Sequence, residues 1–280
     1  MKQDVATPAL LDIDLHDAIR LGQLELVYQP QVRMSDGEIT GMEALLRWAH
    51  PRYGSLLPED FIDIAERNRL VVPIAEWVLH MACMQTRQWQ RSGLPHLTVA
   101  VNLSALHFRQ QGLAGLVSRI LDETGLDPSF LDLEITRSLI AESAAATHDR
   151  FNELRALGVV LSLEDFGTGY SRFGHFMNFP LDQLKIHPSF VGRLPRNTDA
   201  AAIARVIVGM GTRLGVRVMA VGVENRHQAG FLKTIWCEYA QGAFYSQPLA
   251  PDEFRVWARH ALAKSAMLSA DVGHDLLLAA

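Results

Sequence analysis

The sequence predicts an α/β protein built as a modified TIM-type (β/α)8 barrel with one antiparallel strand. Short β-branched segments alternate with longer helical patterns, and polar residues stand where the expected strands end. A turn rather than a helix joins the first two expected strands. The chain has 280 residues, which is long enough for one barrel-sized domain or for two smaller ones. Its composition, 49% hydrophobic and 20% charged, excludes a disordered or collagen-like chain.

Eight segments have the residue types and lengths of β-strands. They are Leu24–Tyr28, Ile39–Arg47, Leu97–Asn102, Leu131–Thr136, Val159–Glu164, Gln183–Ile186, Val216–Val221 and Glu238–Gln241. Helical patterns separate most of them, at Pro73–Gln90, Leu113–Thr124, Ala144–Leu157, Ala200–Leu214 and His227–Thr234. Strands joined by helices run parallel, so the alternation favours one barrel over two domains.

The connection between the first two strands is different. Tyr28 and Ile39 are joined through Ser35-Asp36-Gly37, which is typical of a hairpin turn. A hairpin reverses the chain direction, so the first strand is expected to run antiparallel to the others.

The expected domain boundaries follow the pattern. Residues 1–13 are expected to form an N-terminal extension, residues 14–257 the barrel domain, and the alanine- and leucine-rich residues 258–280 a helical tail. No uncharged run approaches the ~20 residues of a membrane span, and the N-terminus lacks the pattern of a secretion signal. We therefore expect a cytoplasmic protein, in which Cys83 and Cys237 are buried free thiols.

The charge balance limits the class of ligand. The formal net charge is −5 and the pI is about 6.1, which leaves no basic surplus for gripping a nucleic-acid backbone. The sequence therefore predicts no DNA binding, and any nucleotide ligand should be small and locally bound.

Polar residues lie at the ends of seven expected strands, the edge at which parallel barrels carry their functional groups. They are Glu43, Arg47, Asn102, Glu134, Glu164, Asp165, Lys185, Glu224 and Gln241. Each residue alone is explained by a helix cap, an ion pair or a solvated strand end. Their joint placement is what predicts a site.

The oxygen-bearing members of this group predict a metal site. Carboxylates that converge on one barrel mouth repel each other unless a hard divalent cation such as magnesium or manganese lies between them. The candidate ligands are three carboxylates and an amide oxygen, from Glu43, Asn102, Glu134 and the Glu164-Asp165 pair. The histidines are scattered without paired spacing, which argues against a zinc-type cluster.

Several of these residues lie in segments that resemble a known family. Glu43-Ala44-Leu45-Leu46-Arg47 resembles the signature of the EAL-domain family of cyclic di-GMP phosphodiesterases, and the resemblance extends from about Asp14 to Pro251. The supporting segments occur in the family's order: Tyr28-Gln29-Pro30, Val101-Asn102-Leu103-Ser104, Leu133-Glu134-Ile135-Thr136, Asp165-Phe166-Gly167-Thr168-Gly169-Tyr170-Ser171, Leu184-Lys185-Ile186, Gly222-Val223-Glu224 and Gln241-Gly242.

The resemblance implies a barrel with one antiparallel strand and a two-metal phosphodiesterase that opens cyclic di-GMP to linear pGpG. It implies a first ion on Glu43, Asn102 and Glu134, and a second ion near Glu164 and Asp165. Lys185, Asp165 and Glu164 would be the catalytic residues. The ligand contacts would come from Gln29, Arg47, Asp165, Lys185, Glu224 and Gln241.

This sequence departs from the family pattern at five positions. Val221 stands where the family has a glutamate that is a second-metal ligand and general-base candidate, and an isopropyl group can neither coordinate a cation nor accept a proton. Glu164 replaces an aspartate and moves the carboxylate by about one bond length, ~1.5 Å. The remaining departures are Arg137 for a glutamate, His187 for an aspartate and Ala243 for a common aromatic.

These departures affect cleavage more than binding. We expect a degenerate EAL domain that binds cyclic di-GMP as a receptor with weak or no hydrolysis, and that holds one ion or none rather than two. The partners expected are cyclic di-GMP and an unidentified signalling protein or fused domain, and a homodimer is left open. Two alternatives stay open, an active Mg/Mn-dependent phosphodiesterase and a nucleotide-free interaction scaffold.

Overall fold

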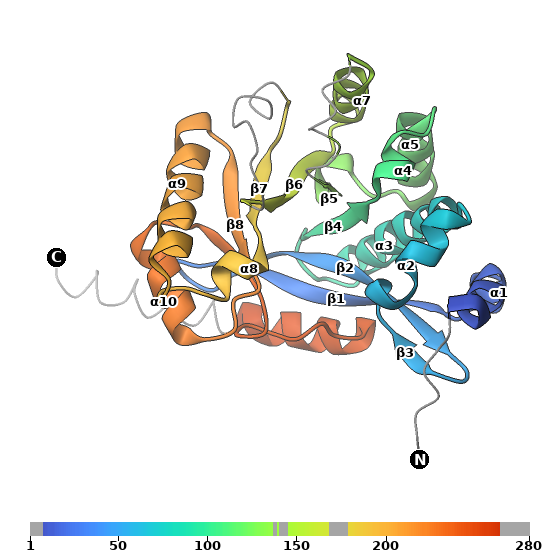
Figure 1. Ribbon diagram of the computed structural model, residues 1–280, viewed down its shortest axis with the longest axis horizontal. Coiled ribbons are helices and arrows are strands. Elements are labelled where there is room, and N and C mark those ends of the chain that lie inside the picture. The colour runs from blue at the N-terminus through green and yellow to red at the C-terminus, as the bar shows by residue number, and fades with distance from the viewer. Residues whose placement is uncertain (1–7, 137–138, 140–144, 168–178, 264–280) are drawn as a thin grey trace.

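The computed structural model describes residues 8–136, 139, 145–167 and 179–263 (Figure 1). Within these residues, none of the helices is long and apolar enough to cross a bilayer.

The strands form a closed barrel with one additional strand outside it. The barrel strands are β1 (Leu24–Arg33), β2 (Ile39–His50), β4 (Thr98–Leu103), β5 (Leu131–Ile135), β6 (Val160–Phe166), β7 (Gln183–Ile186), β8 (Arg217–Val221) and β9 (Tyr239–Gln241). They follow the order β1-β9-β8-β7-β6-β5-β4-β2, and the pairing of β1 with β2 closes the ring. The predicted fold class and all eight predicted strands are confirmed.

β1 is the antiparallel strand that the hairpin predicted. It pairs antiparallel with β2 on one side and with β9 on the other, whereas β2 and β4 to β9 run parallel. The turn uses Gly37 at a φ of 75°, and the carboxylate of Asp36 accepts a 2.9 Å hydrogen bond from the Glu38 backbone N–H. β1 continues five residues past its predicted end at Tyr28. The sequence prediction missed the short strand β3 (Gly54–Leu56), which extends the sheet beyond β2.

Helices cover the outside of the barrel (Figure 1). They are α1 (Pro8–Ala18), α2 (Pro58–Arg67), α3 (Val71–Arg91), α4 (Ala105–Phe108), α5 (Leu113–Thr124), α7 (Ala145–Ala156), α8 (Pro188–Val191), α9 (Thr198–Leu214), α10 (Arg226–Thr234) and a helix over residues 251–263, with a 3-10 turn at Pro128–Phe130. The five predicted helices are confirmed, each with ends within two residues of the expected positions. Residues 264–280 of the expected tail lie outside the described part, and α1 runs across the expected boundary at residue 14.

α9 illustrates why these segments are helical. The Asn197 side chain caps its start by accepting a 2.8 Å hydrogen bond from the Ala200 N–H, and Gly215 ends it in a left-handed conformation. Ala204, Ile207 and Val208 form its buried face. Sequence-local signals therefore define both ends of the helix, and the apolar stripe attaches it to the sheet.

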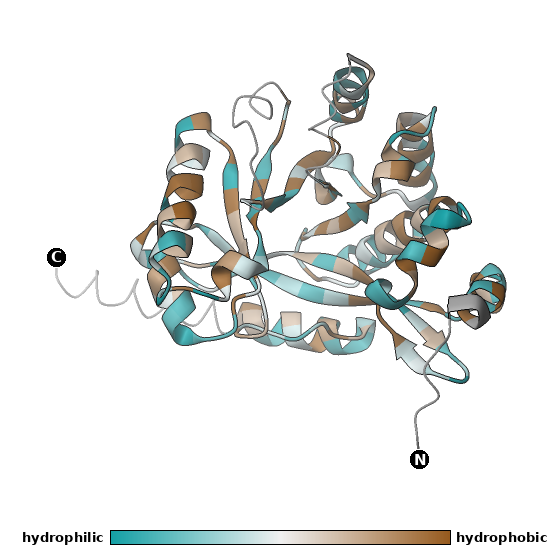
Figure 2. Ribbon diagram, in the orientation of Figure 1, coloured by the Kyte–Doolittle hydropathy of each residue, from teal (hydrophilic) through white to brown (hydrophobic). Residues whose placement is uncertain are grey.

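The strands have one face in the helix layer and one in the barrel interior. On β5, Leu131, Leu133 and Ile135 face the helices, whereas Asp132 and Glu134 point the other way. Both sets are buried, because helices cover the sheet outside and other strands enclose it inside. Figure 2 shows the resulting mixture of hydrophobic and hydrophilic residues along the strands. The polar inner faces are what position the site.

Candidate metal and ligand site

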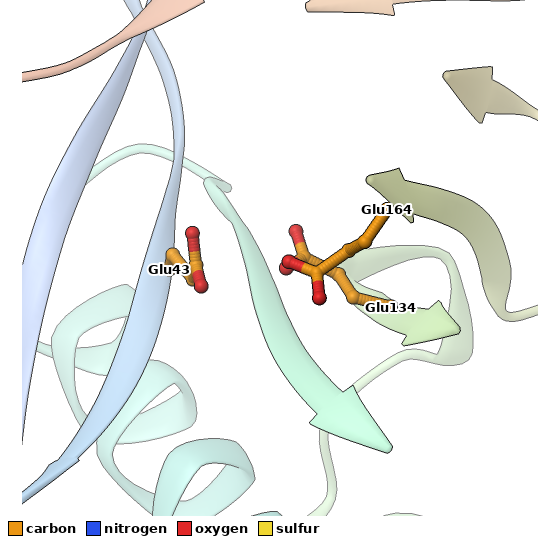
Figure 3. Close-up of side chains that lie close together, drawn as sticks. All are labelled: Glu43, Glu134 and Glu164. Carbon is orange, nitrogen blue, oxygen red and sulfur yellow. The ribbon is translucent and has the colours of Figure 1, made fainter. Parts of the chain in front are cut away.

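Three glutamates from separate strands converge inside the barrel (Figure 3). Glu43 comes from β2, Glu134 from β5 and Glu164 from β6, and each offers a carboxylate oxygen within 4.8 Å of the others. The side chain of Glu134 is completely buried, and that of Glu164 is 23% exposed. Strand alternation placed these residues on inward faces, so the predicted convergence of these three carboxylates is confirmed.

Lys185 on β7 supplies the positive charge of the cluster. Its Nζ lies 3.1 Å from Glu43 Oε2 and 3.9 Å from Glu164 Oε1, and it forms a third ion pair with Glu134. Burial alone would lower the pKa of this ammonium, but the surrounding carboxylates raise it above its usual range. Lys185 is therefore a permanent cation in contact with all three glutamates.

Glu43 is held by donors on both carboxylate oxygens. Asn102 Nδ2 donates to Oε1 at 2.8 Å, and Gln241 Nε2 donates to Oε2 at 2.7 Å. Burial raises the pKa of Glu43, but Lys185 and the two amides outweigh burial and hold this pKa below its usual value. The ionised form of Glu43 is thus built into the site.

Glu134 has a different environment. It forms an ion pair with Lys185 and interacts with the Glu164 side chain, and no amide donor among the described residues holds it as Asn102 and Gln241 hold Glu43. Burial and the nearby Glu43 charge raise the pKa of Glu134 well above its usual value. Burial also raises the pKa of Glu164, and Lys185 offsets this only in part. The cluster therefore has more carboxylate than one ammonium can neutralise.

This donor set fits a divalent cation. The carboxylate oxygens of three glutamates and the nearby amide of Asn102 are the ligand types that hard cations prefer. Glu134 is completely buried among these oxygens, so an ion between the glutamates would offset the charge that burial makes costly. The geometry consequently allows the glutamates to hold one cation.

Asp165 lies outside the three-glutamate cluster. It sits at the end of β6 with a φ of 58°, and its side chain is 51% exposed. Its Oδ1 lies 3.5 Å from His187 Nε2, while His187 Nδ1 accepts a 3.1 Å hydrogen bond from the Ser189 N–H. The structure thus places Asp165 beside His187, one of the residues that depart from the family pattern.

Two of the predicted ligand contacts, Gln29 and Arg47, share the Glu43 face of the β1–β2 pair. Gln29 Oε1 accepts a 2.9 Å hydrogen bond from Gln241. Arg47 Nη1 donates to the Leu46 carbonyl at 2.7 Å, and partial burial lowers the pKa of its guanidinium. The predicted Glu224 is exposed after β8, where its backbone N–H donates to the Gln228 side chain.

Val221 lies at the end of β8, paired with Gln241 on β9. It shares a strand face with Met219, which is the β8 partner of Lys185. The side chain of Val221 is therefore directed to the same interior as the glutamate cluster. Ala243 is exposed just after β9, and Arg137 lies outside the described residues.

Sequence reasoning missed four buried polar residues near the cluster. Ser162 Oγ donates to Asp132 Oδ2 at 2.7 Å, and Gln183 Nε2 donates to Ser162 Oγ at 3.3 Å. Burial raises the pKa of Asp132 to about 6. Gln31 on β1 contacts Gln241. The alternation of polar residues at positions 29 and 31 was the available signal, but β1 was predicted to end at Tyr28.

Comparisons with known proteins agree with this architecture. The EAL domain family matches residues 13–248. The chain belongs to the EAL domain family. A solved structure of the MucR phosphodiesterase in complex with c-di-GMP aligns with a TM-score of 0.84 at 40% identity, covering 87% of this chain and 99% of that chain. The EAL domain of Mycobacterium smegmatis DcpA aligns with a TM-score of 0.74 at 29% identity, covering 85% of this chain and 98% of that one.

Two of the curated relatives are much longer proteins. The bifunctional diguanylate cyclase/cyclic di-GMP phosphodiesterase MucR of Pseudomonas aeruginosa is 40% identical over 86% of this chain and 35% of its own length. The cyclic di-GMP phosphodiesterase NbdA of the same organism is 39% identical over 85% of this chain and 30% of its own length. The chain therefore spans about a third of the length of these relatives.

Proposed function

We propose that this EAL domain binds cyclic di-GMP at the barrel mouth and acts as a receptor with weak or no hydrolysis. The family membership and the c-di-GMP complex of MucR support the choice of ligand. The barrel end with Gln29, Arg47, Lys185 and Gln241 offers two cations and two amides for a dianionic ligand.

This proposal rests on the valine at position 221, at the end of β8. The family resemblance assigns this strand end to a glutamate that ligates the second ion, and the β8–β9 register directs Val221 into the same interior as Lys185 and Gln241. A valine offers no lone pair to a cation and takes no proton from water. Cleavage depends on such groups, whereas binding depends on phosphate neutralisation and hydrogen bonds. The substitution therefore removes more from catalysis than from affinity.

Magnesium or manganese is the cofactor class that fits the remaining donors. Glu43, Asn102 and Glu134 would hold one ion, with Glu164 beside it. A bound divalent cation would neutralise phosphodiester charge and lower the pKa of a water. The Glu164 carboxylate is placed by a side chain one methylene longer than aspartate, and Asp165 turns toward His187. We infer one ion or none rather than two.

The remaining residues have roles that follow from their contacts. Lys185, the candidate catalytic residue, forms ion pairs with Glu43 and Glu134. If a divalent cation bound these glutamates instead, the Lys185 ammonium could bind a phosphate oxygen of the ligand. Gln241 bridges Glu43 and Gln29 and links the metal cluster to the first strand. Glu224 and Asp165 complete the proposed ligand contacts at the exposed rim.

A second candidate function is an active phosphodiesterase. The retained cluster of Glu43, Glu134 and Glu164 around Lys185 favours it, as do relatives named as phosphodiesterases at 39–40% identity. In that case another carboxylate must compensate for Val221.

One assay separates these functions. Purified protein is incubated with cyclic di-GMP and Mg²⁺ or Mn²⁺, and both calorimetric affinity and pGpG formation are measured. The receptor proposal predicts micromolar or tighter binding with little pGpG. Rapid turnover would support the phosphodiesterase, and the absence of binding at micromolar ligand would leave only a scaffold.

The proposal extends to partners and location. A receptor of this kind reports to another signalling protein or to a fused domain, and the greater length of the curated relatives is consistent with fusion. We propose that the domain acts in the cytoplasm. Size-exclusion chromatography with light scattering would measure whether it forms a homodimer.

A further inference from the structure

Two buried glutamines, Gln31 and Gln241, and the partly buried Gln29 form a chain of hydrogen bonds to Glu43 of the three-glutamate cluster. Gln31 Nε2 donates to Gln241 Oε1 at 3.1 Å, and Gln241 Nε2 donates both to Glu43 Oε2 at 2.7 Å and to Gln29 Oε1 at 2.9 Å. Gln29 Nε2 donates in turn to the Ser246 carbonyl at 3.1 Å. The antiparallel pairing produces this arrangement, because Gln31 is opposite Gln241 and Gln29 is opposite Glu43.

Each amide in this series of hydrogen bonds has a defined orientation. Gln241 Nε2 donates to Glu43 Oε2 at 2.7 Å, so the amide nitrogen of Gln241 faces the carboxylate. The Oε1 of Gln241 is then left to accept a hydrogen bond from another donor. Gln31 supplies that donor, and its side chain, like those of Gln241 and Glu43, is less than one-tenth exposed.

Gly41 makes room for Gln31. It is the β2 partner of Gln31, and a Cβ at this glycine would lie 3.0 Å from Gln31 Oε1 and 2.7 Å from the Thr98 carbonyl. The glutamine amide therefore packs against bare backbone, with its oxygen toward Gly41 and its nitrogen toward Gln241. This packing fixes which end of the Gln31 amide meets Gln241.

We propose that Gln31 is a positioning residue for the metal cluster, acting through Gln241 to hold the Glu43 carboxylate. This inference rests on the proposed function only in taking Glu43 as a cation ligand. Residues that orient metal ligands typically alter metal affinity about 10–100-fold when they are replaced. Gln31 is one contact further away, so an effect near the lower end, about tenfold, is expected.

Manganese binding tests the proposal directly. The full chain and its Gln31→Leu, Gln31→Glu and Gln183→Leu variants are titrated with Mn²⁺ alone, and free Mn²⁺ is followed by electron paramagnetic resonance. Gln31→Leu should weaken Mn²⁺ binding about tenfold, and Gln31→Glu should weaken it further, because a second acceptor would face Gln241 Oε1. Gln183→Leu removes an equally buried amide whose contacts are Asp132 and Ser162, and should leave Mn²⁺ affinity unchanged. Wild-type affinity in a folded Gln31→Leu variant would overturn the proposal.

A second readout separates this proposal from the metal site itself. In the wild-type protein without metal, the side-chain amide protons of Gln241 should exchange slowly by NMR, because both are hydrogen-bonded and buried. Gln31→Leu should accelerate this exchange and Gln183→Leu should not. If the wild type binds no Mn²⁺, the metal assignment fails while the exchange experiment still decides the role of Gln31. Unchanged Gln241 exchange in Gln31→Leu would refute that role.

Discussion

Lys185 is the residue around which the interior charges are balanced. Its ammonium contacts Glu43, Glu134 and Glu164, and burial makes each of these charges costly unless it is paired. A divalent cation entering the cluster would compete with Lys185 for the same oxygens. The ammonium of Lys185 thus offsets part of the repulsion among the three glutamates.

Replacing Lys185 tests this charge balance. Lys185→Met leaves three buried carboxylates without their cation, so the metal-free protein should lose about 3–5 kcal/mol of unfolding free energy at neutral pH. Adding Mn²⁺ should recover part of the loss. Urea denaturation with and without Mn²⁺ measures both effects, and Lys233→Met, at an exposed position on α10, is the control. A variant as stable as the wild type would contradict the central placement of Lys185.

His107 predicts a pH dependence of stability. It is buried on α4 with neither ring nitrogen hydrogen-bonded among the described residues, and burial lowers its pKa to about 4. The unfolded chain takes up this proton near pH 6.5 and the folded chain only near pH 4, so the stability it contributes is lost as pH falls through that interval. The loss amounts to about 3 kcal/mol.

Removing the titrating ring removes that part of the pH dependence. The unfolding free energy of His107→Leu, measured by urea denaturation between pH 7 and pH 4, should fall less steeply with acid than that of the wild type. His260→Gln, which changes an exposed histidine, should follow the wild-type curve. Parallel curves for His107→Leu and wild type would show that His107 is not the group responsible.

At the scale of elements, α9 and β8 pack through a glycine. A Cβ on Gly211 would lie 2.2 Å from Val218 Cγ2 and 2.8 Å from the Val216 carbonyl, whereas a Cβ on Gly209 of the same helix meets nothing within 4 Å. Gly211→Ala should therefore cost about 1–3 kcal/mol of unfolding free energy. Gly209→Ala should increase the unfolding free energy by as much as about 1 kcal/mol, because alanine has the higher helix propensity. Equal effects of the two changes on the urea midpoint would contradict this packing.

Most of these elements were predictable from the sequence because their signals are local. Alternation and β-branched residues marked the eight barrel strands, and the helix predicted over Ala200–Leu214 begins two residues inside α9. The full length of β1 was not predictable, because Pro30 interrupts the strand pattern. In addition, the last residues of β1 pair with β9, whose residues lie about 210 positions further along the sequence. β3 is only three residues long and is held by β2 alone.

The sequence identified most residues of the candidate site but not how their side chains are arranged. The inward faces and strand ends identified Glu43, Asn102, Glu134, Glu164, Lys185 and Gln241, which the structure brings together. The sequence could not show that Lys185 sits among the glutamates or that Asp165 turns to His187, because both depend on side-chain conformation across strands. Gln31 was missed because β1 was predicted to end at Tyr28.

At the scale of the whole molecule, the helix over residues 251–263 packs against β1 and α3. Phe254, in the helix over residues 251–263, has its ring centroid 4.8 Å from that of Trp89 on α3 and 6.0 Å from that of Tyr28 on β1. This red helix lies beside β1 in Figure 1. It follows the residues matched by the EAL family, yet Phe254 and Ala258 are fully buried. The barrel core therefore includes this helix.

Truncating Phe254 tests that inclusion. Phe254→Ala opens a cavity between three elements and should lower the unfolding free energy by about 3–5 kcal/mol. Val256→Ala, at an exposed position on the same helix, should change it by less than about 0.5 kcal/mol. Thermal and urea unfolding give both values, and a small effect of Phe254→Ala would mean that the helix is not part of the cooperative core.

The proposed receptor function depends on Val221, which stands where the family resemblance places an oxygen ligand for cleavage. The most direct measurement compares pGpG formation by wild type, Val221→Glu and Val221→Gln under saturating cyclic di-GMP and Mn²⁺. The wild type should turn over slowly or not at all, and Val221→Glu should gain on the order of 10³-fold, with Val221→Gln gaining little. Rapid wild-type turnover, or no gain in a folded Val221→Glu variant that binds the ligand, would contradict the account.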